Sequence, residues 1–277
     1  MNPIKNLKYL LVMIKSEPLH HIKKLFDFLI SFLLSVIKKS KIDYVIVIYT
    51  LGKSGSSSIL STLQRKFSIF NVYQLHFINC EYIRANHSGG FATRNIDKAN
   101  KFLRIHSKNK KKYISLVREP VSREISSFYQ NRQLYFKDVL SNDFKAINNL
   151  IESKGYDLAL NWFDYELKNH LNFDVYSQQF DKTKGFSIYK LDSNTELMIL
   201  RTDCINKIGI VAINKFLNTD IKQIKSANIG NNKSNSLYQK QLKSQFKISE
   251  KNLTKIQNSK FMNHFFKTEE IKSLYKN

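Results

Sequence analysis

The stretch VIVIYTLGKSGSSSIL, residues 45–60, constrains this chain more than any other feature. Its first half is a continuous run of β-branched and aliphatic residues, as expected of a strand buried on both faces. A turn of small residues with one lysine follows, and then Ile59, Leu63 and Phe67 recur at helical spacing. The order of strand, small-residue turn and helix predicts an anion site, because the first turn of a helix presents backbone N–H groups and the positive end of the helix dipole.

The same alternation of strands and helices continues along the chain. The expected strands are Asp43–Thr50, Asn71–Ile78, Lys111–Val117, Gly185–Asp192 and Glu196–Asp203. The expected helices are Ser56–Phe67, Asp97–Arg104, one beginning at Pro120, Asp143–Ser153, Tyr156–Leu171, and a largely helical region from Ile208 onward. This pattern predicts an α/β fold, with a three-layer parallel sheet covered by helices on both faces and a helical C-terminal segment. The short turn between the last two strands indicates an antiparallel pair, or an edge pair that closes the sheet.

The first 41 residues differ from the rest, so we expect residues 42–277 to form the domain and residues 1–41 to precede it. Leu25–Ile37 is apolar over thirteen residues and has a lysine pair on each side, but it contains Asp27. A membrane-spanning helix needs about 20 apolar residues. The segment therefore predicts a helix lying on an anionic membrane face. The expected location is cytoplasmic, with peripheral attachment at the inner membrane face. Packing on the domain or on a partner chain is the alternative.

The net charge of +23 indicates a polyanionic partner or surface. No zinc-finger spacing, aromatic RNA-binding motif or leucine-zipper heptad accompanies the basic residues, so we expect no nucleic-acid partner. An acidic polysaccharide, an anionic membrane or a phosphorylated cofactor fits the charge, and a compositional bias towards lysine is the alternative. Cys80 and Cys204 are isolated, so neither a disulfide framework nor a zinc site is expected.

Two familiar phosphate loops do not fit the turn at residues 52–58. The ATP loop GxxxxGK[ST] would need glycine at position 47, where Val47 lies inside the strand. The dinucleotide pattern GxGxxG is absent. The remaining candidate is the run Lys53 to Ser58, in which Gly55 lets the backbone approach an anion. A plain serine N-cap is the alternative.

A second cationic motif, LVREPVSREISSFYQ, begins at the end of the third strand. Arg118 ends that strand, and Ser126 lies eight residues later in the following helix. Parallel strands end at the same edge of a sheet, so we expect Arg118 and Lys53 to face one pocket. A guanidinium and a hydroxyl would then make a second phosphate clamp. The alternative is that Arg118 pairs with Glu119 or Glu124.

Together these motifs resemble those of the sulfotransferases that use 3′-phosphoadenylyl sulfate (PAPS). GKSGSSS resembles their 5′-phosphosulfate loop, and VREPVSREISSFY resembles their 3′-phosphate motif. The resemblance implies a sulfotransferase or P-loop NTPase-like fold and a PAPS donor without metal. It implies that the donor is bound by Lys53, Ser54, Gly55, Ser56, Ser57, Ser58, Arg118 and Ser126.

A further resemblance extends over residues 161–203, which are similar to a bacterial branch of capsular polysaccharide synthesis proteins. Residues 226–244 and 259–271 resemble the C-terminal segment of sulfotransferase-fold proteins, where a basic loop closes over the nucleotide, which implies a role for Lys233. The Arg-Lys-Gly signature of the soluble small-molecule enzymes is missing. A glycan acceptor, such as a capsular or surface polysaccharide, is therefore expected.

The mechanism that this resemblance implies needs a cation at the leaving oxygen and a general base for the acceptor hydroxyl. Lys53 is the expected cation. His76, at the end of the second strand, is the first choice for the base, and Glu81, His106 and Glu124 are the alternatives. Two other functions stay open: a nucleotide-dependent kinase on a related scaffold, and a binding protein without turnover.

Two further features are expected to have a structural role rather than a role in binding or catalysis. Trp162 shares its expected helix with Phe163 and Leu167, so we expect it to lie in the core. His87–Asn95 contains two adjacent glycines and predicts a surface loop, with a mobile lid as the alternative.

Overall fold

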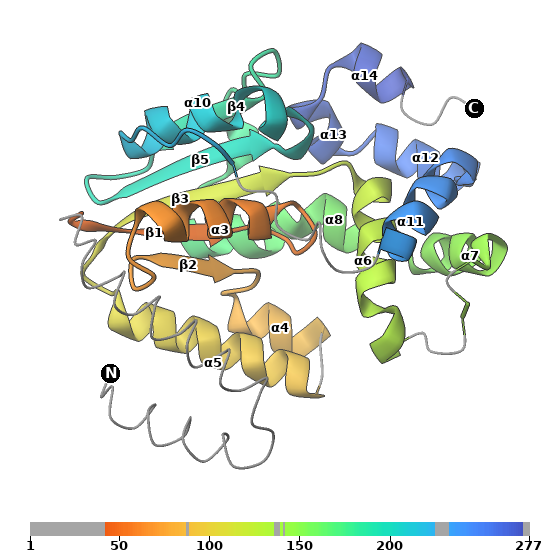
Figure 1. The fold of residues 1–277 in the computed structure, drawn as a ribbon, viewed down its shortest axis with the longest axis horizontal. Helices are drawn as coiled ribbons and strands as arrows, with labels where there is room; N and C mark the ends of the chain where they lie inside the picture. The colour runs from red at the N-terminus through yellow and green to blue at the C-terminus, as the bar shows by residue number, and fades with distance from the viewer. Residues whose placement is uncertain (1–41, 87–88, 136–138, 141, 225–232, 274–277) are drawn as a thin grey trace.

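The computed structural model describes residues 42–86, 89–135, 139–140, 142–224 and 233–273. Within these residues, five strands form one sheet in the spatial order β2-β1-β3-β5-β4 (Figure 1). The strands are β1 (Tyr44–Tyr49), β2 (Val72–Leu75), β3 (Lys110–Val117), β4 (Phe186–Lys190) and β5 (Thr195–Arg201). β1 is parallel to β2 and β3, β3 is parallel to β5, and β4 is antiparallel to β5. The predictions of a mostly parallel sheet and of an antiparallel edge pair are confirmed.

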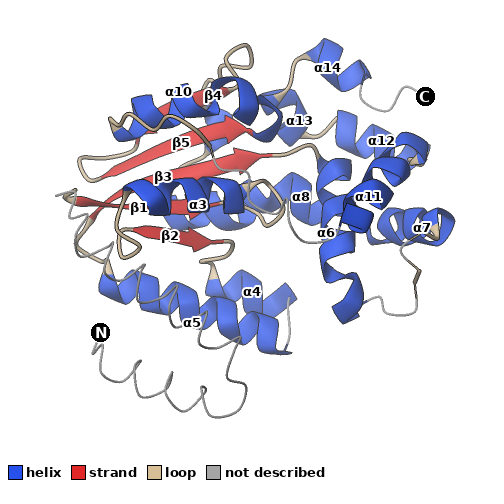
Figure 2. Ribbon diagram, viewed as in Figure 1, coloured by secondary structure: helices blue, strands red, loops and turns tan. Residues whose placement is uncertain are grey.

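Helices connect the strands and cover the sheet (Figure 2). The helices of the first part are α3 (Ser56–Lys66), α4 (Cys80–Asn86), α5 (Gly89–Ile105), α6 (Pro120–Tyr135), α7 (Phe144–Lys154) and α8 (Asp157–Trp162). A π-helical segment, η1 (Phe163–Lys168), continues α8 into α9 (Asn169–Leu171), and two 3-10 turns are η2 (Val175–Ser177) and η3 (Thr202–Cys204). The C-terminal helices are α10 (Ile205–Leu217), α11 (Lys233–Gln245), α12 (Glu250–Gln257), α13 (Lys260–Phe265) and α14 (Thr268–Ser273).

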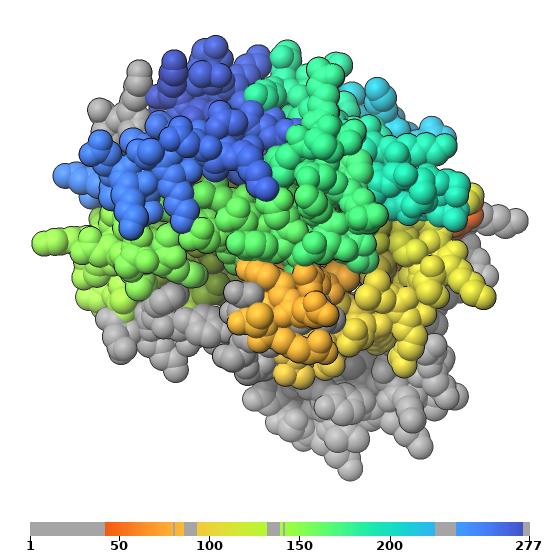
Figure 3. Space-filling view, turned by 180° about the vertical axis from the view of Figure 1, so that it is seen from behind, coloured from red at the N-terminus to blue at the C-terminus, as the bar shows by residue number. Residues whose placement is uncertain are grey.

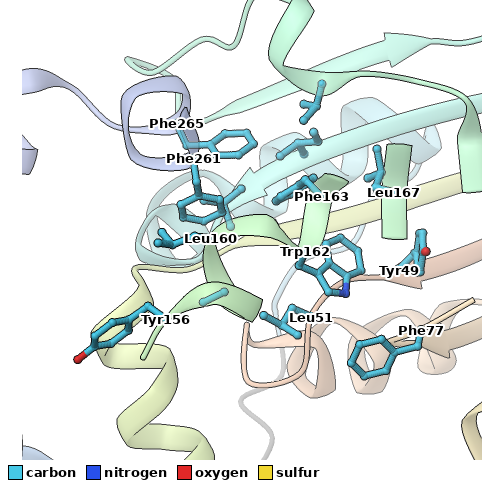
Figure 4. Packing of buried hydrophobic residues seen from close by; sticks show 14 of the residues in the cluster. Tyr49, Leu51, Phe77, Tyr156, Leu160, Trp162, Phe163, Leu167, Phe261 and Phe265 are labelled. Atoms are coloured by element: carbon cyan, nitrogen blue, oxygen red, sulfur yellow. The ribbon is translucent and has the colours of Figure 1, made fainter. Parts of the chain in front are cut away.

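The central strand β1 shows why the sheet has helices on both faces. Successive side chains of a strand point to opposite faces, and β1 is apolar at every position from Val45 to Tyr49. Ile46 and Ile48 pack in one core with residues of α3 and α10. Val47 and Tyr49 belong to the other core, with residues of α5, α6, α8 and α13 (Figure 4). The expected three layers are therefore present.

The prediction of a loop at His87–Asn95 is wrong from Gly89 onward, because α5 begins there rather than near Asp97. Gly89 and Gly90 are the first two residues of the helix, where glycine is tolerated better than in a helix interior. Ala99 and Phe102 lie on the buried face of α5, and their burial stabilises a helix longer than the local sequence suggests.

The prediction for Trp162 can be compared with the structure, whereas the prediction for the N-terminal segment cannot. Trp162 is 1% exposed, which confirms its place in the core. The expected N-terminal helix at residues 1–41 lies outside the described residues. Among the described residues, no helix has the length and apolar character that crossing a membrane requires.

Candidate functional site

The loop between β1 and α3 has a backbone shaped by two residues in the left-handed region. Lys53 has φ 74° and Gly55, the N-cap of α3, has φ 89°. For a residue other than glycine this conformation costs roughly 1–2 kcal/mol, and such outliers cluster at functional sites. A Cβ on Gly55 would also lie 3.4 Å from Ile205 Cδ1. The first turn of α3 contains no acidic residue and its N-cap makes no side-chain hydrogen bond, so no carboxylate of this turn competes with an external anion for the amide end of the helix.

The serines of this loop divide into two groups. The side chains of Ser54 and Ser56 are buried, and the Ser56 hydroxyl accepts a hydrogen bond from Gln74 Nε2 at 2.7 Å. Ser57 and Ser58 are half-buried in the first turn of α3. Ser57 is therefore better placed than Ser54 and Ser56 to offer a hydroxyl group to a ligand.

Two guanidinium groups hold consecutive carbonyl groups of the loop. Arg118 donates from Nη1 to the carbonyl oxygen of Lys53, and Arg123 donates from Nε to the carbonyl oxygen of Gly52 at 3.1 Å. Arg118 follows β3, which is parallel to β1, so the ends of both strands meet at this sheet edge. The structure thus brings Arg118 to the backbone of Lys53 at this edge, and the expectation that their side chains face one pocket stays a prediction.

Glu119 and Glu124, the alternative partners of Arg118, each accept hydrogen bonds from other groups, while Glu119 also interacts electrostatically with Arg118. Both carboxylate oxygens of Glu119 accept backbone hydrogen bonds in the first turn of α6, from Val121 N at 2.6 Å and Ser122 N at 2.8 Å. Glu124 accepts a hydrogen bond from Arg123 Nη1 within a buried ion pair. These carboxylates fix α6 and Arg123 beside the loop.

The local excess of positive charge changes the chemistry of Lys53. Burial, together with the charges of Arg118 and Arg123, lowers the pKa of Lys53 to about 8. The pKa of Arg118 is also lowered, mainly by burial, although Glu119 opposes this shift. Lys243, in the last turn of α11, lies within electrostatic range of Arg118. An anion bound between these cations would remove their mutual repulsion and raise the pKa of Lys53.

His76 lies just after β2 and faces the same loop. Its Nδ1 is 2.7 Å from the carbonyl oxygen of Thr50, which only accepts hydrogen bonds, so Nδ1 carries the proton. The other ring nitrogen, Nε2, lies 3.9 Å from the position that a Cβ on Gly52 would occupy. Burial lowers the pKa of His76, and the nearby cations Lys98, Arg123 and Lys53 lower it further. The ring is therefore neutral at neutral pH, with the lone pair of Nε2 at the loop.

The other residues expected at the site have different positions. His106 is buried at the end of α5 with its Nδ1 3.2 Å from Asn109 Oδ1, close to the start of β3 and therefore at the opposite sheet edge. Glu81 is exposed in the first turn of α4. Ser126 is half-buried in α6. Lys233 is the first residue of α11, and α11 packs against α6.

A hydrogen-bonded clamp between η1 and the segment after β2 was not expected. Glu166 is fully buried, and its Oε2 accepts from Tyr49 Oη at 2.7 Å, from Ile78 N at 2.7 Å and from Asn79 N at 3.0 Å. Trp162 adds a bond from Nε1 to the carbonyl oxygen of His76 at 3.0 Å. Short π-helical segments such as η1 occur often at functional sites. The clamp fixes the carbonyl group of His76 and the backbone of Ile78 and Asn79, which follow it.

The sequence reasoning also missed Arg123 and Lys243. A cation in the first turn of a helix opposes the helix dipole, and this could have identified Arg123 as a residue that needs an anionic partner. Lys243 carries no local signal, because its place beside Arg118 depends on how α11 packs on α6. Among the described residues, no group of three or more His, Cys, Asp or Glu side chains is arranged to hold a metal ion.

Comparison with known proteins gives one finding. No curated protein matches the chain, and no solved structure matches it. Residues 137–267, which are 131 of the 277, match the family model described as "Putative capsular polysaccharide synthesis protein". The matched segment includes η1, α10, α11 and α13, but it begins after the loop of Lys53 and after Arg118. This match suggests a role in polysaccharide biosynthesis.

Proposed function

We propose that this protein is a PAPS-dependent sulfotransferase that transfers a sulfuryl group to a hydroxyl of a glycan, expected to be a capsular or surface polysaccharide. The observation that carries the proposal is the meeting of Lys53 and Arg118 at one sheet edge, where the guanidinium of Arg118 holds the Lys53 carbonyl. A donor with phosphate groups at both its 5′ and 3′ ends suits a loop with a second cationic element beside it. The polysaccharide match of residues 137–267 supports a glycan as the acceptor.

Different residues would bind the 5′-phosphosulfate and the 3′-phosphate of the donor. The amide end of α3, Ser57 and Lys53 would bind the 5′-phosphosulfate, as anions are bound at other helix N-termini. Arg118 and Ser126 would bind the 3′-phosphate, which ATP lacks. Lys243, and Lys233 at the start of α11, would add positive charge from the C-terminal segment. Selection of PAPS over ATP would therefore depend mainly on Arg118.

The chemistry needs a proton acceptor and a stabilised leaving group. PAPS supplies an activated sulfuryl group: its S–O bond to the 5′-phosphate breaks while an S–O bond to the acceptor oxygen forms. Lys53 stabilises the charge that collects on the phosphate oxygen, and this requires its protonated form. His76 takes the proton of the acceptor hydroxyl on Nε2, and its Nδ1–H bond to Thr50 keeps that nitrogen free of a proton. Positioning and electrostatics supply the catalysis, as in phosphoryl transfer.

Calorimetry with 3′-phosphoadenosine 5′-phosphate (PAP), ATP and AMP tests the proposal. We expect PAP to bind without Mg²⁺ and more tightly than ATP or AMP. Equal or tighter binding of ATP that requires Mg²⁺ would instead support a kinase. Tight PAP binding without transfer of sulfate from PAPS to any glycan would support a binding protein without turnover. If PAP does not bind at all, the proposal is wrong.

The cellular setting of this reaction is part of the same proposal. The net charge of +23 favours contact with anionic surfaces. We therefore place the enzyme on the cytoplasmic side, in peripheral contact with the inner membrane face, where a growing surface polysaccharide would be accessible. Co-sedimentation with anionic vesicles, compared with neutral vesicles, tests the membrane contact. Equal sedimentation with both would contradict it.

A further inference from the structure

A cavity of about 500 Å³ has in its lining Arg123, the residue that bonds the Gly52 carbonyl of the loop. Its walls come from α4, the start of α6, the end of α7, the start of α8, and η1. The residues that matter here are Tyr82, Arg123, Glu124, Asp157, Leu158 and Tyr165. Figure 3 shows part of this region from behind, where α4 (orange) adjoins the green surface of the segment that contains α8 and η1. The volume lies within the range of roughly 300–1,000 Å³ typical of small-ligand sites.

Arg123 connects this cavity with the proposed catalytic groups. Its side chain forms part of the cavity wall, while its Nε bonds the carbonyl oxygen of Gly52. Nε2 of His76 also lies near Gly52, 3.9 Å from the position that a Cβ on this glycine would occupy. Arg123 is therefore the link between the cavity and the part of the loop where His76 lies.

Tyr165 gives the cavity a flat aromatic wall, and Tyr82 stacks behind it, between Tyr165 and Phe77. The rings of Tyr82 and Tyr165 have centroids 4.8 Å apart and an interplanar angle of 22°. Asn79 fixes both residues, because its Nδ2 donates to the carbonyl oxygen of Tyr165 at 2.9 Å and its Oδ1 accepts from the amide of Tyr82 at 3.1 Å. The electron-rich face of an aromatic ring attracts the weakly positive C–H groups on one face of a sugar ring. A wall that is already ordered loses little entropy on binding.

The charges of the cavity distinguish it from the loop. Arg123 and Lys154 are balanced by Glu124 and Asp157, whereas cations are in excess around Lys53. Glu124 pairs with Arg123, and Asp157 pairs with Lys255 at 2.7 Å. Carboxylates of this kind can accept hydrogen bonds from hydroxyl groups, and the four charged residues that line the cavity carry no net charge among themselves.

We propose that this cavity binds an uncharged sugar ring of the acceptor glycan, stacked on Tyr165, with its free hydroxyl directed to His76. This inference rests on the proposed function, since it assigns the acceptor side of the same site. The cavity accordingly restricts the acceptor to a glycan that has a neutral sugar at or next to the modified position.

Saturation-transfer NMR on the full chain with saturating PAP tests this assignment. The probes are cellobiose, lactose, chitobiose and N-acetyllactosamine, with cellobiuronic acid as the charged comparison. We expect at least one neutral disaccharide to bind more tightly than the acid. Tyr165→Ala should weaken this binding roughly three- to tenfold, the range expected for one aromatic contact. Leu158→Trp should weaken it too, because it fills the cavity without removing the stack.

Phe70→Ala provides the matched control, because Phe70 is an exposed aromatic residue in the turn before β2. The assignment is wrong if no neutral disaccharide binds, if the acid binds as tightly, or if Tyr165→Ala and Leu158→Trp bind sugar like the unaltered chain. A PAP titration of the same samples separates the two proposals. Loss of PAP affinity in Leu158→Trp would assign the cavity to the nucleotide base, whereas failure of the unaltered chain to bind PAP would overturn the proposed function instead.

Discussion

The indole Nε1 of Trp162 donates a hydrogen bond to the carbonyl oxygen of His76 at 3.0 Å, across 86 residues of sequence. This bond joins residues 137–267, which match the polysaccharide family model, to the residue that directly follows β2. Trp162 packs edge-on against Tyr49, and both lie in the core that Figure 4 shows with Leu51 and Phe77. The position of His76 therefore depends on residues that lie far along the chain.

Glu166 gives the first prediction. Replacing it with leucine leaves three buried donors without an acceptor, at a cost of roughly 1–3 kcal/mol each. We expect Glu166→Leu to lower the free energy of unfolding by at least about 3 kcal/mol. Glu166→Gln keeps an oxygen that can accept and should lose less. Urea denaturation of the full chain measures both, with Glu250→Gln as an exposed control. Equal losses for the leucine and glutamine variants would show that the hydrogen bonds are not the cause.

Arg118 gives the second prediction. Arg118→Ala should weaken PAP binding at least about tenfold, because a hydrogen bond to a charged group contributes roughly 1.5–3 kcal/mol. Calorimetry provides the measurement, and ATP binding should change less because ATP has no 3′-phosphate. Arg104→Ala removes an equal charge from an exposed position in α5 and serves as the control. Unchanged PAP affinity in Arg118→Ala would mean that the phosphate clamp is assigned to the wrong residue.

The fold could be predicted largely from the sequence, whereas the site could be predicted only in part. β1 is an uninterrupted run of aliphatic and aromatic residues, and β3 ends in a buried segment, Tyr113–Val117, in which only Ser115 is polar. Parallel strands end at a common edge, so the meeting of Lys53 and Arg118 follows from local patterns. Glu166 has no such signal, because its three donors come from segments about 90 to 120 residues earlier. The stack of Tyr82 on Tyr165 likewise depends on how α4 packs against η1.

The lowered pKa of Lys53 gives the third prediction, on pH dependence. Free Lys53 loses its proton near pH 8, while bound PAP would hold the proton and raise this pKa. PAP affinity should therefore fall above pH 8, by up to about tenfold per pH unit for one linked proton. The Lys53→Arg variant keeps its charge and should show little change between pH 7 and 10. A wild-type affinity that stays constant over this range would contradict the role of Lys53.

Turnover gives the fourth prediction. Lys53 would stabilise charge that develops only as the sulfuryl group leaves, so Lys53→Ala should lose more rate than affinity. We expect a loss of about 100-fold or more in turnover of PAPS, as for the removal of one preorganised donor. Release of PAP from PAPS with water as the acceptor can be followed without knowing the glycan. Undiminished turnover in Lys53→Ala would reject the proposed role.

The stability of the ligand-free protein gives the last prediction. Lys53 is a cation placed beside Arg118 and Arg123, so the folded state binds its proton less tightly than the unfolded state, where the ordinary pKa of 10.5 applies. Between pH 8 and 10.5 the unfolded state then binds more protons, and the free energy of unfolding should rise with pH. Lys53→Met removes the charge, so it should be more stable than the wild type at pH 7 and lack this rise.

Lys53→Gly should raise the free energy of unfolding by roughly 1–2 kcal/mol, because glycine adopts φ 74° without the steric cost that lysine has there. Urea denaturation at pH 7 and pH 10 measures both effects. If both variants are less stable than the wild type at pH 7, then neither the charge nor the backbone conformation of Lys53 destabilises the folded state. The interpretation of the loop as a strained binding site would then be wrong.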